Sequence, residues 1–278
     1  MKGSGRLVGG MVAGSMLAVA ALAGDPNKIV VDGSTTVGPI AKAFAEYYMG
    51  KNPGVNITVS ESGSGNGAKS LINAACDVAS MSRAMKEKEL KAAEEAGVLP
   101  IPWVIAMDGI AVVVHPGNPV NKLTIEQVRD IYTGKITNWK ELGGPDQAIV
   151  VISRDTNSGT YESFETLVLK SEKIAATAEY VGSNGAIRQR VQTTPAAVGY
   201  VGMAFLEGVK ALEINGILPT AETVTSAKYP VSRPLYLYTN GKPKAGTHLY
   251  NFVMLYATPE GRKIVEDVGF VPVQPKAK

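Results

Sequence analysis

Residues 148–160 read AIVVISRDTNSGT, an apolar run followed by a turn rich in Ser, Thr and Gly. The apolar run at 148–152 predicts a strand, and residues 161–170 predict a helix. A turn between a strand and a helix start leaves backbone N–H groups free, and the helix dipole adds partial positive charge there. Ser158 and Thr160 add hydroxyl donors, and the Arg154 guanidinium fits two oxygens of a tetrahedral oxyanion. The alternative interpretation is an ordinary helix N-cap, for which Ser and Thr are common residues.

Two loops upstream have the same design. Residues 33–39 read GSTTVGP and residues 60–67 read SESGSGNG, and each loop joins a predicted strand to a predicted helix. In open α/β sheets, ligands collect at the carboxyl ends of strands, beside helix starts. Each loop alone is a weak signal, but the three together predict one anion-binding site.

Strands and helices alternate along the chain. The pattern predicts strands at 28–31, 55–60, 77–81, 103–107, 110–115, 148–152, 179–182, 197–201 and 235–239, and helices at 39–49, 68–75, 86–96, 124–132, 161–170, 245–256 and 258–268, with another ending at 191. Thr124 is expected to cap the helix at 124–132, and Ser183-Asn184-Gly185 joins the strand at 179–182 to the helix that ends at 191. Residues 134–146 are expected to form a polar loop and residues 271–278 a loose tail. This β-loop-α repetition predicts an α/β fold with a mostly parallel sheet.

The N-terminus has the pattern of an export signal. Lys2 and Arg6 precede an apolar, small-residue run that ends in Ala21-Leu22-Ala23, which predicts a signal peptide at 1–23 and a periplasmic protein. A membrane anchor is the alternative, but the run is barely long enough to span a bilayer. Cleavage removes two positive charges and no acid, so the net charge falls from +3 to +1, which does not favour nucleic-acid binding.

Enzymatic and metal-binding interpretations are weaker. Cys76 is the only cysteine and the two histidines, His115 and His248, lie far apart, so no disulfide, metal site or cofactor is expected. Ala68 stands where a phosphate-cradling P-loop needs glycine, and no nucleophile elbow surrounds Ser64 or Ser158. No catalytic residue is therefore predicted.

Several motifs together resemble the PstS family, the phosphate-binding subunits of bacterial phosphate ABC transporters. They span essentially the whole mature chain and comprise the sequences at 33–36, 62–67, 77–83, 108–112, 131–139, 154–160 and 198–200. The resemblance implies a type II periplasmic binding protein: two α/β lobes, two crossovers and phosphate clamped in the cleft between the lobes. It further implies delivery to the permease subunits of an inner-membrane ABC importer, and we expect a monomer.

The resemblance also implies which residues contact phosphate. It assigns Thr35 and the Thr36 backbone from the first loop, Ser64 from the second, and Arg154, Ser158, Gly159 and Thr160 from the third. Ser34 and Gly65, neighbours in the first two loops, complete the expected phosphate contacts, together with Ser82, Arg83 and Asp108.

One position departs from the family pattern. Some members carry an Asp where this chain has Ser82, followed by Arg83, and that Asp accepts a hydrogen bond from the proton on phosphate. We assign this role to Asp108, with Asp77 and Glu61 as lesser candidates; the alternative for Asp108 is a turn residue before Gly109. Arg83 either adds positive charge to the site or forms a surface ion pair.

The lobes are expected to be discontinuous in sequence. Lobe one is predicted at 25–107 plus 231–278 and lobe two at 108–230, with hinges near Asp108 and Pro230. Two other functions stay open: a binder of sulfate or molybdate that uses the same loops, and a secreted phosphatase or other hydrolase with Ser64 or Ser158 as nucleophile.

Overall fold

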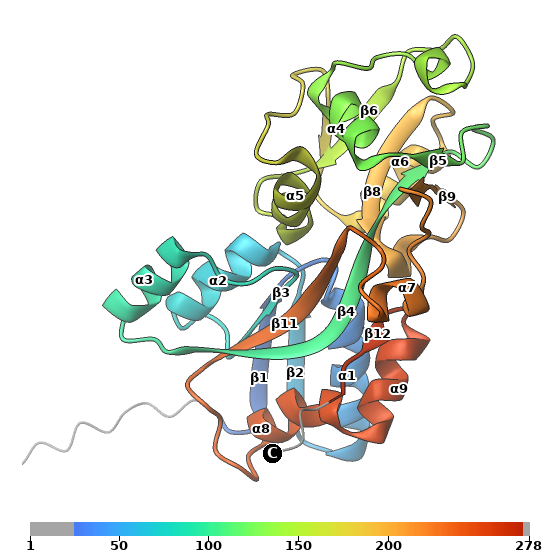
Figure 1. Ribbon diagram of the computed structural model, residues 1–278. Helices are drawn as coiled ribbons and strands as arrows, with labels where there is room; N and C mark the ends of the chain where they lie inside the picture. Colours follow the sequence, from blue (N-terminus) through green and yellow to red (C-terminus); the bar gives the residue numbers. More distant parts are fainter. Residues whose placement is uncertain (1–24, 275–278) are drawn as a thin grey trace, which may run out of the picture.

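The computed structural model describes residues 25–274, which form two α/β lobes on one curled mixed sheet (Figure 1). The strands are β1 (Lys28–Gly33), β2 (Asn56–Ser60), β3 (Val78–Met81), β4 (Pro100–Val114), β5 (Lys122–Leu123), β6 (Val150–Arg154), β7 (Glu179–Val181), β8 (Ala197–Gly202), β9 (Lys210–Ala211), β10 (Glu213–Ile214), β11 (Ser232–Asn240) and β12 (Val271–Pro272). The helices are α1 (Gly38–Lys51), α2 (Ser64–Ile72), α3 (Glu87–Glu95), α4 (Ile125–Thr133), α5 (Gly159–Phe164), α6 (Asn184–Gln192), α7 (Ala221–Thr225), α8 (His248–Val253) and α9 (Pro259–Asp267), with short 3-10 helices at Trp139–Leu142, Met203–Phe205 and Met254–Ala257.

Two long strands join the lobes. The main sheet has the order β2-β1-β3-β11-β4-β8-β6-β7, and β4 runs from one lobe into the other with β11 beside it (Figure 1). β11 is antiparallel to both β3 and β4, and β4 is antiparallel to β8, whereas β1, β2 and β3 pair in parallel, as do β6, β7 and β8. The register of β4 and β11 places Arg233 opposite Asp108 where the strands pass between the lobes.

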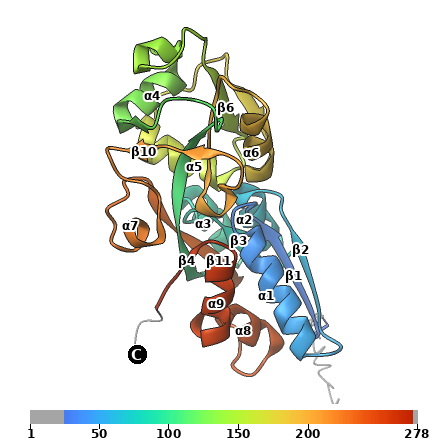
Figure 2. The same cartoon turned by 90° about the vertical axis from the view of Figure 1, so that its right-hand side faces the viewer.

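The lobe that contains β1, β2 and β3 buries both faces of its sheet. Alternate side chains of a strand point to opposite faces. Leu235 and Leu237 of β11 therefore pack with α1, α8 and α9, whereas Tyr238 packs with α2 and α3. Figure 2 shows α1 next to α8 and α9 on one side of this lobe.

The second lobe also buries both faces of its part of the sheet. Val112 and Val114 of β4 join the core beneath α4 and α5, whereas Ala111 and Val113 pack under α6. Thr124 caps α4, as the sequence predicts, by accepting the backbone N–H of Gln127.

The structure corrects several predicted boundaries. β4 is one continuous strand through Asp108 and Gly109, because β11 pairs with both residues on one side, while on the other side β12 pairs up to Met107 and β8 from Ile110 onward. The sheet is accordingly mixed rather than mostly parallel at its centre. Trp139 lies in a 3-10 helix and is fully buried, although a polar loop was predicted around it.

Helix starts and ends differ as well. α2 begins at Ser64, inside the Gly-rich loop, and not at residue 68. The helix predicted at 161–170 begins at Gly159, and its last turn, Glu165–Leu169, is π-helical. Part of the predicted tail forms β12, which pairs with β4.

The expected signal peptide at 1–23 lies outside the described residues. Among the helices within residues 25–274, none has the length and apolar character needed to cross a bilayer.

Candidate functional site

The structure brings the three Gly/Ser/Thr loops together at the seam between the lobes. The Thr36 and Thr160 hydroxyl oxygens, from the first and third loops, lie 2.8 Å apart. Gly159 packs against the second loop so closely that a Cβ there would lie 2.6 Å from Ser82 Oγ and closer still to Ser64 Oγ. Glycine is therefore required at 159 for the lobes to approach this closely.

The first loop is held by its own backbone and by Ser34. Gly33 has φ +137°, and a Cβ there would collide with the Ser80 carbonyl oxygen. Ser34 Oγ accepts the backbone N–H groups of Thr36 and Val37, so this hydroxyl shapes the turn before α1. Thr35 and Thr36 are both buried.

The second loop crosses to the other lobe. The Gly65 N–H donates to the Asn157 carbonyl at 3.0 Å, and Gly63, with φ +99°, lies beside the same carbonyl. Ser64 is fully buried and its Oγ accepts the Ser82 N–H at 3.1 Å. This places Ser64, Gly65 and Ser82 at the interface with the third loop.

The third loop presents Arg154 at the end of β6. Arg154 is buried; its Nε and Nη2 donate to the carbonyls of Val181 and Gly182, and Nη1 has no hydrogen-bond partner among residues 25–274. Burial lowers the pKa of Arg154 against the pull of Asp155, and the positive charge of Arg233 lowers it further. A buried guanidinium nitrogen without a partner raises the free energy of the folded protein unless a bound group accepts a hydrogen bond from it.

Tyr200 stabilises the third loop through contacts with Arg154 and Phe164. Its phenolic oxygen accepts the Arg154 backbone N–H at 3.1 Å, and its ring stacks on Phe164 of α5 at 4.0 Å between centroids. Ser158 acts as the N-cap of α5 by accepting the Tyr161 N–H. The N-cap interpretation is thus correct for Ser158, which is buried, whereas Thr156 and Asn157 of the same loop are exposed.

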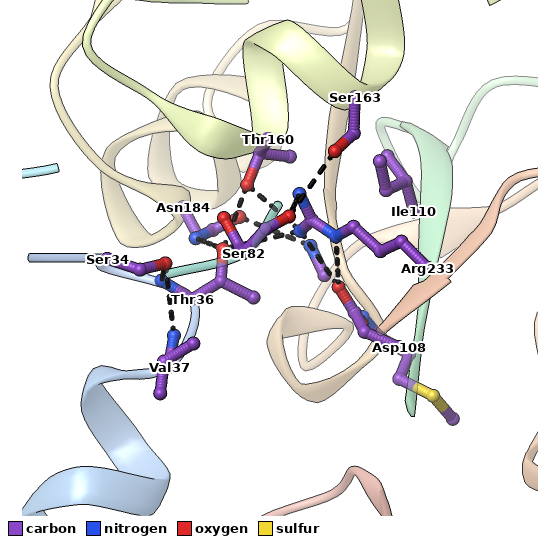
Figure 3. A network of polar contacts seen from close by, with 12 residues as sticks. Ser34, Thr36, Val37, Ser82, Asp108, Ile110, Thr160, Ser163, Asn184 and Arg233 are labelled. Atoms are coloured by element: carbon purple, nitrogen blue, oxygen red, sulfur yellow. Dashed lines mark hydrogen bonds and ion pairs between the residues drawn. The ribbon is translucent and has the colours of Figure 1, made fainter. Parts of the chain in front are cut away.

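Arg233 is a central residue of this site that the sequence did not reveal. Its Nε and Nη2 donate to Asp108 Oδ2 at 3.1 and 2.8 Å, its Nη1 donates to the Ser82 carbonyl, and its Nη2 also lies 3.0 Å from Thr160 Oγ1 (Figure 3). Arg233 stands outside every Gly/Ser/Thr loop, two residues before the predicted strand at 235–239. Only its register opposite Asp108 could have identified it.

Asn184 is a second such residue. It is fully buried at the start of α6, where the sequence suggested only a turn. Its Nδ2 donates to Thr36 Oγ1 at 2.9 Å and to Thr35 Oγ1 at 3.2 Å, and its Oδ1 accepts the Gly202 N–H. Asn184 thus connects the first loop to the second lobe.

Asp108 lies in the site but is not a turn residue. It is fully buried, and its Oδ1 accepts the Met203 N–H at 3.0 Å while Oδ2 accepts from Arg233. Burial raises the pKa of Asp108, and the Arg233 guanidinium and the Met203 N–H act in the opposite direction. The lesser candidates lie apart: Glu61 pairs with Lys42, and Asp77 accepts the Val30 N–H.

Among the described residues, Arg83 makes its side-chain hydrogen bonds and ion pairs with Ala84, Glu89 and Glu162 and none with the three loops. Its Nη1 and Nη2 form a bidentate pair with Glu89, 2.7 Å to each oxygen, and its Nε pairs with Glu162 of the other lobe. Lys86 Nζ also contacts Glu162, at 2.7 Å. We call these four residues the Glu162 ion-pair cluster.

The chemistry of the site suits an oxyanion. The site contains two buried guanidiniums, Arg154 and Arg233, and one buried carboxylate, Asp108, so the formal charge of these three groups is +1. Hydroxyl and backbone donors from three loops surround them, and such donors bind ionised oxygens strongly in a site that excludes water. Within residues 25–274, His, Cys, Asp and Glu form no group that could hold a metal ion.

Comparison with known proteins agrees with this geometry. A family model described as a PBP superfamily domain matches residues 20–258. The phosphate-binding protein PstS of Borreliella burgdorferi is 33% identical, over 90% of this chain and 92% of its own, and that of Staphylococcus saprophyticus is 33% identical, over 88% and 80%. The crystal structure of a putative phosphate ABC transporter substrate-binding protein with bound phosphate, from Clostridium perfringens, is 35% identical, with a TM-score of 0.83 over 89% of this chain and all of that one.

Proposed function

Because the chain belongs to the PstS family of phosphate-binding proteins, within the PBP superfamily, we propose that it captures inorganic phosphate between its lobes and delivers it to an ABC importer. The observation that carries the proposal is the buried Nη1 of Arg154, which has no hydrogen-bond partner among residues 25–274, at the place where the three donor loops converge. We propose no chemical step: the protein binds phosphate and releases it unchanged.

We propose that phosphate is held by the donors of the three loops. Thr35, the Thr36 backbone, Ser64, Gly159 and Thr160 supply hydroxyl and N–H groups, and Arg154 supplies charge. Ser158 orders the third loop as the cap of α5, while Ser34 and Gly65 shape the first two loops. The burial of Thr35, Thr36, Ser64, Thr160 and Arg154 supports this assignment, since donors gain strength where water is excluded.

We propose that Asp108 accepts the hydrogen bond of the phosphate proton. Its Oδ1 has a single described N–H partner, from Met203, and a carboxylate oxygen can accept two hydrogen bonds. Ser82 contributes through its hydroxyl. Arg83, whose guanidinium binds Glu89 and Glu162, acts in lobe closure rather than on phosphate.

We propose hinge bending of lobe one, 25–107 plus 231–278, against lobe two, 108–230. Hinges near Asp108 and Pro230 would coincide with the place where β4 and β11 cross between the lobes. Hydrogen bonds between the loops of the two lobes, such as that of Gly65 with Asn157, support a closed form that encloses the ligand.

We further propose a monomer in the periplasm, exported by a signal peptide cut after Ala23, that docks on the importer's permease subunits. The relatives named PstS and the solved phosphate ABC transporter substrate-binding protein support this placement. Edman sequencing or mass spectrometry of the mature protein tests the cleavage site.

Isothermal titration calorimetry of protein stripped of endogenous phosphate tests the function. We expect saturable binding of one phosphate per chain and much weaker binding of sulfate and molybdate. The same preparation should not hydrolyse a chromogenic phosphate ester; turnover of the ester would favour a phosphatase that uses Ser64 or Ser158. Tighter binding of sulfate or molybdate than of phosphate would assign the site to that oxyanion.

A further inference from the structure

The hydroxyl of Thr36 is surrounded by donors. Asn184 Nδ2 lies 2.9 Å and Arg233 Nη2 lies 3.4 Å from Thr36 Oγ1. Both are N–H groups that cannot accept a proton from Thr36. Figure 3 shows the three side chains together. All three are buried, so water does not compete for these contacts.

The orientation of the Asn184 amide is fixed by a second contact. The Gly202 N–H donates to Asn184 Oδ1 at 3.1 Å, which identifies Oδ1 as the oxygen. The NH₂ group must then face Thr36. An inverted amide would set an N–H against the Gly202 N–H, leaving both buried donors unsatisfied.

The neighbours of the Thr36–Thr160 hydroxyl pair restrict where its protons can go. A Thr hydroxyl has two lone pairs and one proton. Asn184 Nδ2 donates to Thr36 Oγ1, and the Arg233 Nη2 proton not used by Asp108 Oδ2 is shared between Thr160 Oγ1 at 3.0 Å and Thr36 Oγ1 at 3.4 Å, so these neighbours are donors and cannot accept a hydrogen bond from the pair. Thr160 Oγ1 lies 2.8 Å from Thr36 Oγ1. If Thr36 donates its hydrogen bond to Thr160, the hydroxyl proton of Thr160 is free to bind another acceptor. If Thr160 donates to Thr36 instead, the hydroxyl proton of Thr36 is free.

We propose that Asn184 and Arg233 are positioning residues that direct one hydroxyl of the Thr36–Thr160 pair to donate a hydrogen bond to the bound oxyanion. This inference rests on the proposed function and adds to it a source of selectivity for ionised oxygens. Neither residue needs to touch phosphate: Asn184 acts through Thr36 at 2.9 Å, its shorter contact beside that to Thr35 at 3.2 Å, and Arg233 acts through Thr36 and Thr160. Asp108 holds Arg233 in the orientation this requires.

A double-mutant cycle on phosphate affinity tests the inference. Thr36→Val removes the hydroxyl with little change of shape, and Asn184→Ala removes the amide. Asn184→Ala should weaken phosphate binding by about tenfold in the parent, the equivalent of one hydrogen bond, and by less than about twofold in the Thr36→Val background. Equal losses in both backgrounds would overturn the inference, because Asn184 would then act independently of the hydroxyl.

Asn118→Ala serves as the matched control. Asn118 is also buried, and its Oδ1 accepts a backbone N–H, of Val120, outside the three loops. Loss of the Asn118 amide should lower the melting temperature and leave phosphate affinity unchanged. If Asn184→Ala does not fold, the cycle is repeated with Asn184→Ser, with the same expected coupling. Failure of the parent to bind phosphate would refute the proposed function, whereas binding with additive losses would refute only this inference.

Discussion

Arg233 and Asp108 face each other on the two strands that cross between the lobes, with Arg233 Nη2 2.8 Å from Asp108 Oδ2. Both side chains are almost completely buried. A buried ion pair contributes little net stability, but removing one partner leaves an uncompensated charge and costs about 3–5 kcal/mol. The pair therefore fixes the polar groups of the site at the joint between the lobes, and the following predictions depend on that geometry.

Arg154→Ala should weaken phosphate binding by about 10- to 100-fold, the equivalent of a charge-assisted hydrogen bond of roughly 1.5–3 kcal/mol. The reason is the buried Nη1, which has no described protein partner. Calorimetry measures the change. Arg190→Ala, which breaks a half-exposed pair with Glu179, is the control and should leave affinity unaltered. Parent-like affinity of Arg154→Ala would remove this arginine from the site.

Asp108→Asn should lower phosphate affinity and reduce discrimination against sulfate. Phosphate near neutral pH carries a proton that a buried carboxylate can accept, whereas sulfate offers only lone pairs and like charge. A competition titration with both anions measures the ratio of affinities. An Asn variant that rejects sulfate as strongly as the parent would show that another group, such as Ser82, accepts the proton.

Glu162→Gln should weaken phosphate binding about three- to tenfold without a large change in melting temperature, because it removes a charge pair that joins the two lobes while Arg83 keeps its pair with Glu89. Glu162 lies between Arg83 and Lys86 of the opposite lobe, with its side chain only 11% exposed. Small-angle scattering should show that phosphate-free Glu162→Gln is more open than the phosphate-free parent. Asp267→Asn, in an exposed pair with Lys263 within one helix, is the control. Identical affinities for Glu162→Gln and the parent would mean that the Glu162 ion-pair cluster does not contribute to closure.

Acid should weaken the same cluster. Burial alone would raise the pKa of Glu89, but hydrogen bonds from Arg83 and from the Lys86 N–H lower it below its ordinary value. A carboxyl whose pKa is lower in the folded state adds stability that is fully present above its unfolded pKa of about 4.3 and is lost as the pH falls through the folded value. The melting temperature of Glu89→Gln should therefore fall less than that of the parent between pH 5 and pH 3. This interval brackets the ordinary pKa of a Glu side chain, about 4.3. Parallel pH profiles of the two proteins would contradict this account.

The sequence was informative where local chemistry determines structure. The three loops could be predicted because each combines a strand end, small polar residues and a helix start, and the structure brings Thr36, Ser64 and Gly159 together. Thr124 was identified as a cap for the same local reason.

The remainder depends on contacts between distant segments. Arg233 and Asn184 reach the first loop from 197 and 148 residues away, and no local pattern marks either one. β4 stays continuous through Asp108 and Gly109 because β11 and β8 pair with it, which overrides the local turn signal. Arg83 directly follows Ser82, so the sequence suggested a site residue. In the structure its side chain forms ion pairs with Glu89 and Glu162.

Calorimetric titration of the phosphate-stripped parent protein with phosphate, repeated with Arg154→Ala, tests the central claim most directly. We predict one phosphate per chain for the parent and at least about tenfold weaker binding for the variant. Absence of phosphate binding by the folded parent protein, or equal affinity of the parent and Arg154→Ala, would contradict the account.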